Sequence, residues 1–312
     1  MRGSELGTSL VAVSLFASVL TSSGRAEARP ELELRPLHPR PGDMVWGELK
    51  SAETSTEATV ELLGYRYRWP RADDGAFRGA LAIPIETEPG PVEAHVRVGA
   101  LVWDVRVPIE GRTFPESRLR VGKKYGRKKQ PPALEARLER ERAAMHAVYA
   151  APPTPAESWG APSIPTRRPI KTSVFGTKRT FNGQLKSRHY GLDMRGATGD
   201  PVAAIAPGRV VLSGMRFYSG GTLVVDHGGG LFSLYFHLSK RTVEVGAAVE
   251  GGERIGAVGA SGRVTGPHLH LSLAVRAEPL EGGPVRGLYV DPEPVLEQTT
   301  EILTRAQAAS AR

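Results

Sequence analysis

Five histidines and one aspartate in the C-terminal half of the chain are the side chains best suited to chemistry. They are His189, Asp193, His227, His237, His268 and His270. Neutral imidazoles and a carboxylate are typical zinc ligands in proteins. A catalytic zinc takes three protein ligands and leaves a position for water, and this set exceeds that need. We therefore expect three of these side chains to hold a zinc ion and two others to perform acid–base chemistry on a peptide bond.

Strand geometry predicts how some of these side chains are oriented. Side chains alternate along a strand, so His268 and His270 should project from one face. The same rule places Tyr235 and His237 on a common face, where Tyr235 is either a core residue or a hydrogen-bond donor to the transition state. Two adjacent imidazoles in a half-buried strand are costly unless a metal ion or hydrogen bonds satisfy them.

The other members of the set have different local contexts. Gly191 separates His189 from Asp193, and a turn at this position would bring the two side chains together. His227 follows a strand-like run and opens a glycine-rich turn. We expect it to be structural or to lie at the rim of the site.

No glutamate base accompanies the cluster, because the chain contains no H-E-x-x-H motif. Histidine, whose unperturbed pKa is about 6.5, would then serve as the general base. The surplus of imidazoles over the needs of a metal ion is consistent with this role.

The elements that carry the cluster are predicted to be strands. Between residues 170 and 298, short apolar and β-branched runs alternate with glycines, and no stretch has helical periodicity. Strand-like runs include residues 222–225, 231–238, 242–245 and 268–275. This pattern predicts an antiparallel β domain, followed by a tail at residues 299–312.

Residues 29–112 predict a second, smaller β unit. Residues 92–98 and 101–107 alternate apolar and polar side chains, and Pro-Gly and Asp-Gly pairs mark turns. Several short strands with regular turns favour a small β-sandwich. His38 and His95 are isolated, so the unit has no catalytic set, and spacing, docking or occlusion of the site are its open roles.

Residues 113–169 predict a connector that contains one helix. A basic cluster at residues 123–129 either grips an anionic polymer or is a solvated linker. Residues 133–149 place apolar side chains near one face, which predicts a helix, and the proline-rich stretch 151–169 predicts an extended segment. The expected fold class is therefore mainly β, with a small N-terminal β-sandwich, a helical and proline-rich linker, and a C-terminal antiparallel β domain that holds the metal site.

The chain of 312 residues has a net charge of +8 and no cysteine. The positive charge favours anionic partners, but no nucleic-acid-binding motif is present, so nucleic acid is not an expected partner. Without cysteine, the chain can form no disulfide, no thiolate ligand and no lipid anchor through an N-terminal cysteine.

The N-terminus has the pattern of an export signal. Arg2 precedes an apolar run at residues 10–20, and Ala26-Glu-Ala28 has the form of a cleavage site. Residues 1–28 are predicted to be a signal peptide cleaved near Ala28, with an uncleaved anchoring helix as the alternative. No other run is long and apolar enough for a transmembrane helix, so we expect the mature chain in the periplasm or outside the cell.

Over residues 175–294 the sequence resembles the lysostaphin-type zinc metallopeptidases, which cleave peptide cross-links in bacterial cell walls. Four motifs carry the resemblance: Phe181-Asn-Gly-Gln-Leu-Lys-Ser-Arg-His-Tyr-Gly-Leu-Asp193, Gly199-Asp-Pro-Val202, Tyr235-Phe-His-Leu238 and Thr265-Gly-Pro-His-Leu-His270. The zinc ligands of the family fall on His189, Asp193 and His270. Its two other site histidines fall on His237 and His268.

The resemblance implies a zinc endopeptidase that hydrolyses the peptide cross-links of peptidoglycan, with Zn2+ as cofactor and His237 and His268 as proton-transferring residues. Some relatives have lost ligands and only activate other wall hydrolases. A catalytically silent, cell-wall-binding regulator is therefore the alternative, although the intact ligand positions favour the enzyme. Cell-division or wall-synthesis proteins are candidate partners.

Overall fold

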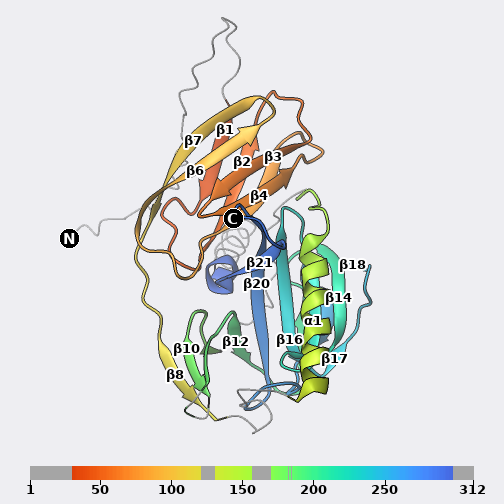
Figure 1. Ribbon diagram of the computed structural model, residues 1–312. Coiled ribbons are helices and arrows are strands. Elements are labelled where there is room, and N and C mark those ends of the chain that lie inside the picture. The colour runs from red at the N-terminus through yellow and green to blue at the C-terminus, as the bar shows by residue number, and fades with distance from the viewer. Residues whose placement is uncertain (1–29, 121–130, 157–169, 182, 184, 298–312) are drawn as a thin grey trace, which may run out of the picture.

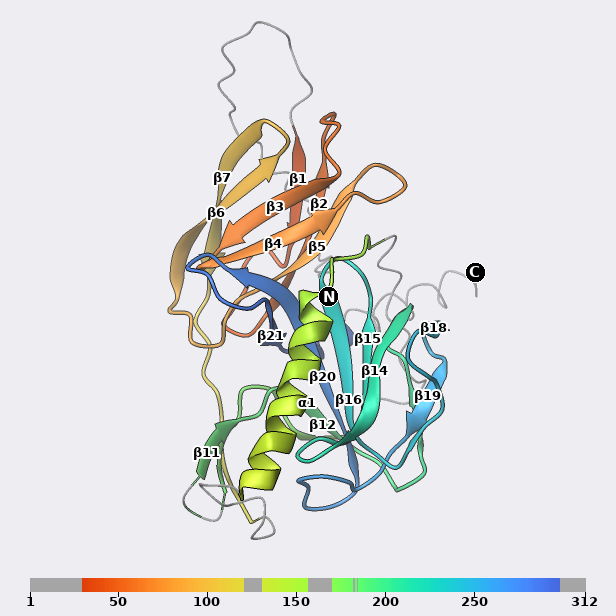
Figure 2. The same cartoon turned by 45° about the vertical axis from the view of Figure 1, so that its right-hand side comes forward.

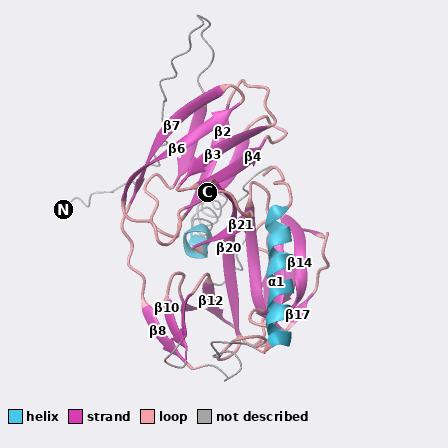
Figure 3. Ribbon diagram, in the orientation of Figure 1, coloured by secondary structure: helices cyan, strands magenta, loops and turns pink. Residues whose placement is uncertain are grey.

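The computed structural model describes residues 30–120, 131–156, 170–181, 183 and 185–297. The predicted signal peptide, most of the basic cluster and proline-rich stretch, and the C-terminal tail lie outside these described residues. Within them the fold is mainly β, as the sequence predicts (Figure 3). None of the described helices is long and apolar enough to cross a membrane.

Two sheets near the N-terminus pack as the predicted β-sandwich (Figure 1). The first has the order β1-β2-β5, with β1 at Glu31–Arg35, β2 at Met44–Lys50 and β5 at Phe77–Ala82. The second has the order β4-β3-β6-β7, with β3 at Glu57–Leu62, β4 at Tyr65–Pro70, β6 at Gly90–Val98 and β7 at Leu101–Ile109. Buried and exposed side chains alternate along β6 and β7, because one face of each strand covers the core.

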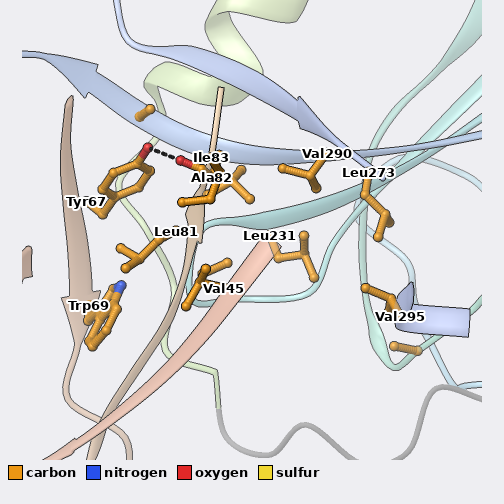
Figure 4. Packing of buried hydrophobic residues seen from close by; sticks show 14 of the residues in the cluster. Val45, Tyr67, Trp69, Leu81, Ala82, Ile83, Leu231, Leu273, Val290 and Val295 are labelled. Carbon is orange, nitrogen blue, oxygen red and sulfur yellow. Dashed lines mark hydrogen bonds between the residues drawn. The ribbon is translucent and has the colours of Figure 1, made fainter. Parts of the chain in front are cut away.

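The core of the sandwich is built around Trp69, which has no exposed surface. A Cβ atom at either Gly47 or Gly79 would lie 2.0 Å from its indole ring, so only glycine fits at these two positions. Beside the indole, the buried Tyr67 hydroxyl donates a hydrogen bond to the carbonyl of Ala82 at 3.1 Å (Figure 4). These close contacts explain why two glycines occur inside strands, where they otherwise weaken a sheet.

The C-terminal unit is organised around a central antiparallel sheet with the order β18-β14-β15-β16-β20. Its strands are β14 (Gly208–Arg216), β15 (Gly220–Asp226), β16 (Leu231–Leu238), β18 (Ala248–Val249) and β20 (His268–Pro279). Strands β12 (Leu192–Arg195) and β21 (Arg286–Val290) pair with β20, and β9 (Lys171–Ser173) pairs with β12.

Two smaller sheets complete the described strands. One contains β8 (Glu116–Leu119), β10 (Lys178–Phe181) and β11 (Leu185–Arg188), and the other contains β13 (Pro201–Ala203), β17 (Lys240–Arg241) and β19 (Arg254–Ala257). β8 lies in the predicted connector, where the sequence suggested only one helix, and it runs parallel to β10. The segment that leaves the sandwich therefore becomes part of the sheet that flanks the candidate site.

The predicted strand at residues 242–245 is wrong. These residues form a loop between β17 and β18, although they alternate polar and apolar side chains. Gly246, with a φ of 92°, turns the chain at this point, and Val245 is 58% exposed. The pairing of β17 with β19 ends at Arg241, so the alternating residues that follow have no partner strand among the described residues and do not form a strand themselves.

Helix α1 (Pro132–Ala150) closely matches the helix predicted at residues 133–149. Proline is favourable in the first turn, because a backbone N–H there would have no partner within the helix. The C-terminal half of α1 packs Met145, Val148 and Tyr149 onto apolar side chains of β15 and β16. Figure 2 shows α1 lying across the central sheet.

The two units share one sheet and one core. Strand β20 extends beyond the C-terminal unit and pairs with β4, with Glu278 opposite Arg66 and Pro279 opposite Tyr65. Buried side chains of both units form a single cluster (Figure 4). The sandwich is therefore fixed against the C-terminal unit by backbone pairing and apolar contact.

Arg112 adds a buried ionic bridge between the units. It donates hydrogen bonds to Asp43 Oδ1 at 3.1 Å and to the carboxylate of Asp291. Asp43 and Asp291 are only 4% and 2% exposed. Removing the guanidinium would leave two buried carboxylates without their shared cation.

We expect Arg112→Met to lower the free energy of unfolding by about 3–5 kcal/mol, the usual cost of breaking a buried ion pair on one side. Urea unfolding of the full chain measures this change. Arg35→Met is the matched control, because the Arg35–Glu33 pair is solvent-exposed, and it should cost less than about 1 kcal/mol. Equal urea midpoints for the two variants would contradict the bridging role.

Candidate metal centre

Three strands and the turn before β12 bring the predicted site residues together. In the register of the sheet, Asp193 on β12 lies opposite His270 on β20, and His189 precedes β12. His237 lies near the end of β16 and His268 at the start of β20. All five side chains line one cavity of about 540 Å³, which we call the groove.

His189, Asp193 and His270 form a compact triangle of ligand atoms. His189 Nε2 lies 2.9 Å from Asp193 Oδ1 and 3.0 Å from His270 Nδ1, and His270 Nδ1 lies 2.8 Å from Asp193 Oδ1. All three residues are buried. Among the described residues, this is the group of histidine and carboxylate side chains whose geometry could hold a metal ion.

Hydrogen bonds on the outer side of both rings orient the ligand atoms. His189 Nδ1 lies 2.9 Å from the carbonyl oxygen of Val174, which can only accept. His270 Nε2 lies 2.8 Å from Ser272 Oγ, and that hydroxyl donates to the carbonyl of Tyr190. A neutral ring that donates outward turns its lone pair inward. Two nitrogen lone pairs then face a carboxylate oxygen, an arrangement that is favourable only around a cation.

Gly191 permits this packing by its lack of a side chain. A Cβ atom there would lie 2.5 Å from His270 Nε2 and 2.5 Å from the carbonyl oxygen of Leu271. The turn expected at Gly191 thus also provides space for a ligand ring.

Arg179 on β10 holds the other oxygen of Asp193, and no sequence motif identified it. Its Nη2 donates to Asp193 Oδ2 at 2.6 Å and to Ser173 Oγ at 2.7 Å. Because the guanidinium occupies Oδ2, Oδ1 is the oxygen that faces the two imidazoles. Arg179 is therefore a positioning residue for the carboxylate, and it could have been found only from tertiary contacts.

His237 and His268 lie beside the triangle, with ring centroids 4.9 Å apart. His237 Nδ1 lies 2.8 Å from the carbonyl oxygen of Ser261, and His268 Nδ1 lies 2.8 Å from that of Gly266. Each Nδ1 therefore carries the proton, and each Nε2 can accept one. His268 Nε2 lies 3.6 Å from Asp193 Oδ1, which places this lone pair next to the candidate metal ligands.

The common face expected for Tyr235 and His237 is wrong. The register with β15 shifts between Gly221 and Leu223, which leaves one extra residue in β16. His237 adopts a left-handed φ of 64° at this bulge. As a result Phe236 and His237 both line the groove, whereas Tyr235 is fully buried and accepts a hydrogen bond from the Ile205 backbone N–H. Tyr235 is a core residue.

His227 has a structural role, in agreement with its expected context. Its Nδ1 lies 2.7 Å from the Pro207 carbonyl oxygen and its Nε2 lies 2.7 Å from Ser233 Oγ. Burial lowers the pKa of His227 to about 4, so the ring is neutral at pH 7. It is not among the residues that line the groove.

Burial also keeps two imidazoles in the groove neutral. It lowers the pKa of His270 to about 4 and that of His237 to about 3, and the charges of His270 and His268 add to the effect at His237. Burial alone would raise the pKa of Asp193, but hydrogen bonds and charge interactions with His189 and His270 hold it well below its usual range. A charged carboxylate and neutral imidazole are the protonation states that metal binding requires.

We expect Gly191→Ala to weaken zinc binding by about 10-fold or more, because the added methyl group displaces His270 or its hydroxyl support. Competition with a chromophoric chelator measures the dissociation constant. Gly214→Ala on β14 is the control, since a Cβ there meets nothing within 4 Å. Unchanged affinity in Gly191→Ala, with a folded protein by circular dichroism, would refute the packing argument.

Residues 187–282 match a family model described as Peptidase family M23. A 92-residue stretch is 44% identical to the peptidoglycan DD-endopeptidase ShyA of Vibrio cholerae, covering 30% of this chain and 21% of that protein. A 91-residue stretch is 40% identical to lysostaphin of Staphylococcus simulans, covering 28% of this chain and 18% of that protein. The matched part thus spans about a fifth of the length of these relatives.

The likeness to a solved structure extends further along the chain. A crystal structure from Pseudomonas aeruginosa, assigned to peptidase M23, is 27% identical and superposes with a TM-score of 0.54. The alignment covers 83% of this chain and 95% of that one. It therefore includes strands of the N-terminal sandwich as well as the C-terminal unit.

Proposed function

Starting from the peptidase M23 domain in residues 187–282, we propose that this protein is a zinc-dependent endopeptidase that hydrolyses peptide cross-links of bacterial peptidoglycan. One observation carries the proposal. Three inward-facing ligand atoms converge within 3.0 Å of one another, and two further imidazoles present proton-accepting nitrogens beside them in the same groove.

Zinc is the metal that we propose for the triangle of His189, Asp193 and His270. Two imidazoles and one carboxylate are a typical ligand set for catalytic zinc, and three protein ligands leave room for water. When bound, the ion supplies Lewis acidity that activates water and polarises the scissile carbonyl. Arg179 keeps the Asp193 carboxylate oriented toward it.

His268 and His237 would transfer protons during the reaction. We assign His268 as the general base, because its Nε2 lone pair lies next to the metal ligands. His237 remains neutral at pH 7, since burial lowers its pKa to about 3. It would take up positive charge only when negative charge develops beside it, and so it would stabilise the oxyanion or protonate the leaving amine.

The relatives support a proposal for the substrate and setting. ShyA is named a peptidoglycan DD-endopeptidase, and we propose direct peptide cross-links of peptidoglycan as the substrate here. Cleavage of a signal peptide near Ala28 would deliver the chain to the periplasm, where cell-division or wall-synthesis proteins are candidate partners. We retain the division into a signal peptide (1–28), sandwich (29–112), linker (113–169), peptidase domain (170–298) and tail (299–312).

We expect His270→Ala to lose both zinc and activity, because one of three ligands is gone. His268→Ala should keep one zinc per chain and lose about 10²–10⁴-fold in kcat/KM, the usual contribution of a general base. Metal analysis and turnover of a cross-linked peptide measure the two effects. His95→Ala, an exposed histidine of the sandwich, is the control; stoichiometric zinc in His270→Ala would disprove its ligand role.

The reaction itself is tested by mass spectrometry of products from defined cross-linked peptides incubated with the zinc-loaded full chain. We expect the cross-link to be cut and a new free amine and carboxylate to form. If zinc is bound and no peptide or purified wall is cut, the silent wall-binding regulator becomes the better description.

A further inference from the structure

A second cavity, of about 400 Å³, lies between helix α1 and the central sheet. It shares four wall residues with the groove, namely Tyr218, Ser219, Phe236 and Tyr289. The two spaces are therefore neighbours separated only by side chains that border both. We call the second space the α1 cavity.

The α1 cavity lies over the same sheet face as the metal ligands. Phe236 is directly opposite His270 in the register, and cross-strand neighbours project from one face. The two rings stack, with centroids 5.1 Å apart and an interplanar angle of 8°. Leu234, two residues earlier on β16, lines the α1 cavity. A peptide that crosses the metal site can thus continue along this face toward α1.

Arg216 gives the α1 cavity a cationic group. Its Nη1 donates to the backbone carbonyl of Glu141 at 2.7 Å, and the described residues take no other hydrogen bond from its guanidinium. Burial lowers the pKa of Arg216, against the opposing influence of nearby Glu141, Tyr289 and Tyr149. All four side chains line the α1 cavity.

The hydroxyl of Tyr149 is a second polar group in this cavity. Tyr149 is 4% exposed, and its hydroxyl makes no hydrogen bond of normal geometry with the described residues, although it interacts with the side chain of Tyr289. Burial raises the pKa of Tyr149 well above its usual value, so the hydroxyl keeps its proton. A buried polar group without a hydrogen bond of normal geometry is uncommon in native proteins and calls for a ligand or another explanation.

The carboxylate of Glu141, which lines the α1 cavity, already accepts hydrogen bonds from within the protein. Glu141 Oε1 and Oε2 accept from the Phe217 N–H at 3.0 and 3.1 Å, and Oε1 also accepts from Arg137 Nε at 2.8 Å. Arg142, another lining residue, pairs with Glu139. Arg216 and Arg286 are therefore the lining arginines that form no salt bridge with a carboxylate among the described residues.

We propose that the α1 cavity is a subsite for a carboxylate on one arm of the peptide whose bond is cut at the metal centre. Arg216 would pair with the carboxylate and Tyr149 would donate a hydrogen bond to it, as charge-assisted recognition requires. This inference rests on the proposed endopeptidase function and deepens it. Helix α1 lies outside residues 187–282, so the subsite would be an addition of this chain to the matched family segment.

The test uses two synthetic cross-linked peptides that differ only in whether the carboxyl groups flanking the scissile bond are free or amidated. Their affinities are measured by calorimetry with the zinc-loaded full chain carrying His268→Ala, which should slow turnover by about 10²–10⁴-fold. We expect the free-acid peptide to bind at least about 10-fold more tightly than the amide, the preference expected of a desolvated charge-assisted pair.

Arg216→Gln should abolish this preference, and Tyr149→Phe should reduce it several-fold. Arg209→Gln is the matched control, as Arg209 lies on the same strand and also donates to one backbone carbonyl, that of Gly246, but does not line the cavity. It should keep the full preference.

Equal affinity of the parent protein for both peptides overturns the inference, as does a preference that survives Arg216→Gln. Cleavage is scored separately with wild-type protein. Cleavage without carboxylate preference refutes the subsite and leaves the endopeptidase intact. A preference lost in Arg216→Gln, without cleavage, supports the subsite and refutes the proposed reaction.

Discussion

The metal centre depends on the repulsion between three electron-rich atoms that the backbone forces together. The carbonyl of Val174 and the Ser272–Tyr190 pair fix the outer nitrogens of His189 and His270, so both rings direct lone pairs toward the Asp193 carboxylate. Such a centre is stable only with positive charge in it. Arg179 neutralises the second carboxylate oxygen from outside and leaves the inner one for a cation.

The surrounding fold meets this constraint with rigid elements. Two of the three candidate ligands lie on paired strands, and the paired register sets the position of Asp193 relative to His270. Sites built on strands hold their geometry more closely than sites on loops. One irregular feature, the bulge at His237, turns that imidazole into the groove at the expense of a left-handed backbone conformation.

Much of this arrangement could be predicted from the sequence, because it follows from local patterns. Strand alternation predicts that His268 and His270 share a face, and apolar spacing predicts α1. The bulge at His237 could not be predicted, since it depends on how β15 and β16 align. Neither Arg179 nor the position of α1 over the ligand-bearing face could be predicted, because both arise from contacts between segments distant in sequence. The prediction that Tyr235 shares a face with His237 was wrong because of the bulge at His237.

Strand β20 begins at His268, carries the candidate ligand His270, and ends paired with the sandwich. Its 12 residues span roughly 40 Å at the usual rise of a strand. The sandwich is therefore held in a fixed position relative to the groove and is not a module on a flexible tether. A molecule bound to the sandwich would be held at one distance and one angle from the groove. Its effective concentration at the groove would be set by this geometry, without the entropic cost of closing a flexible linker.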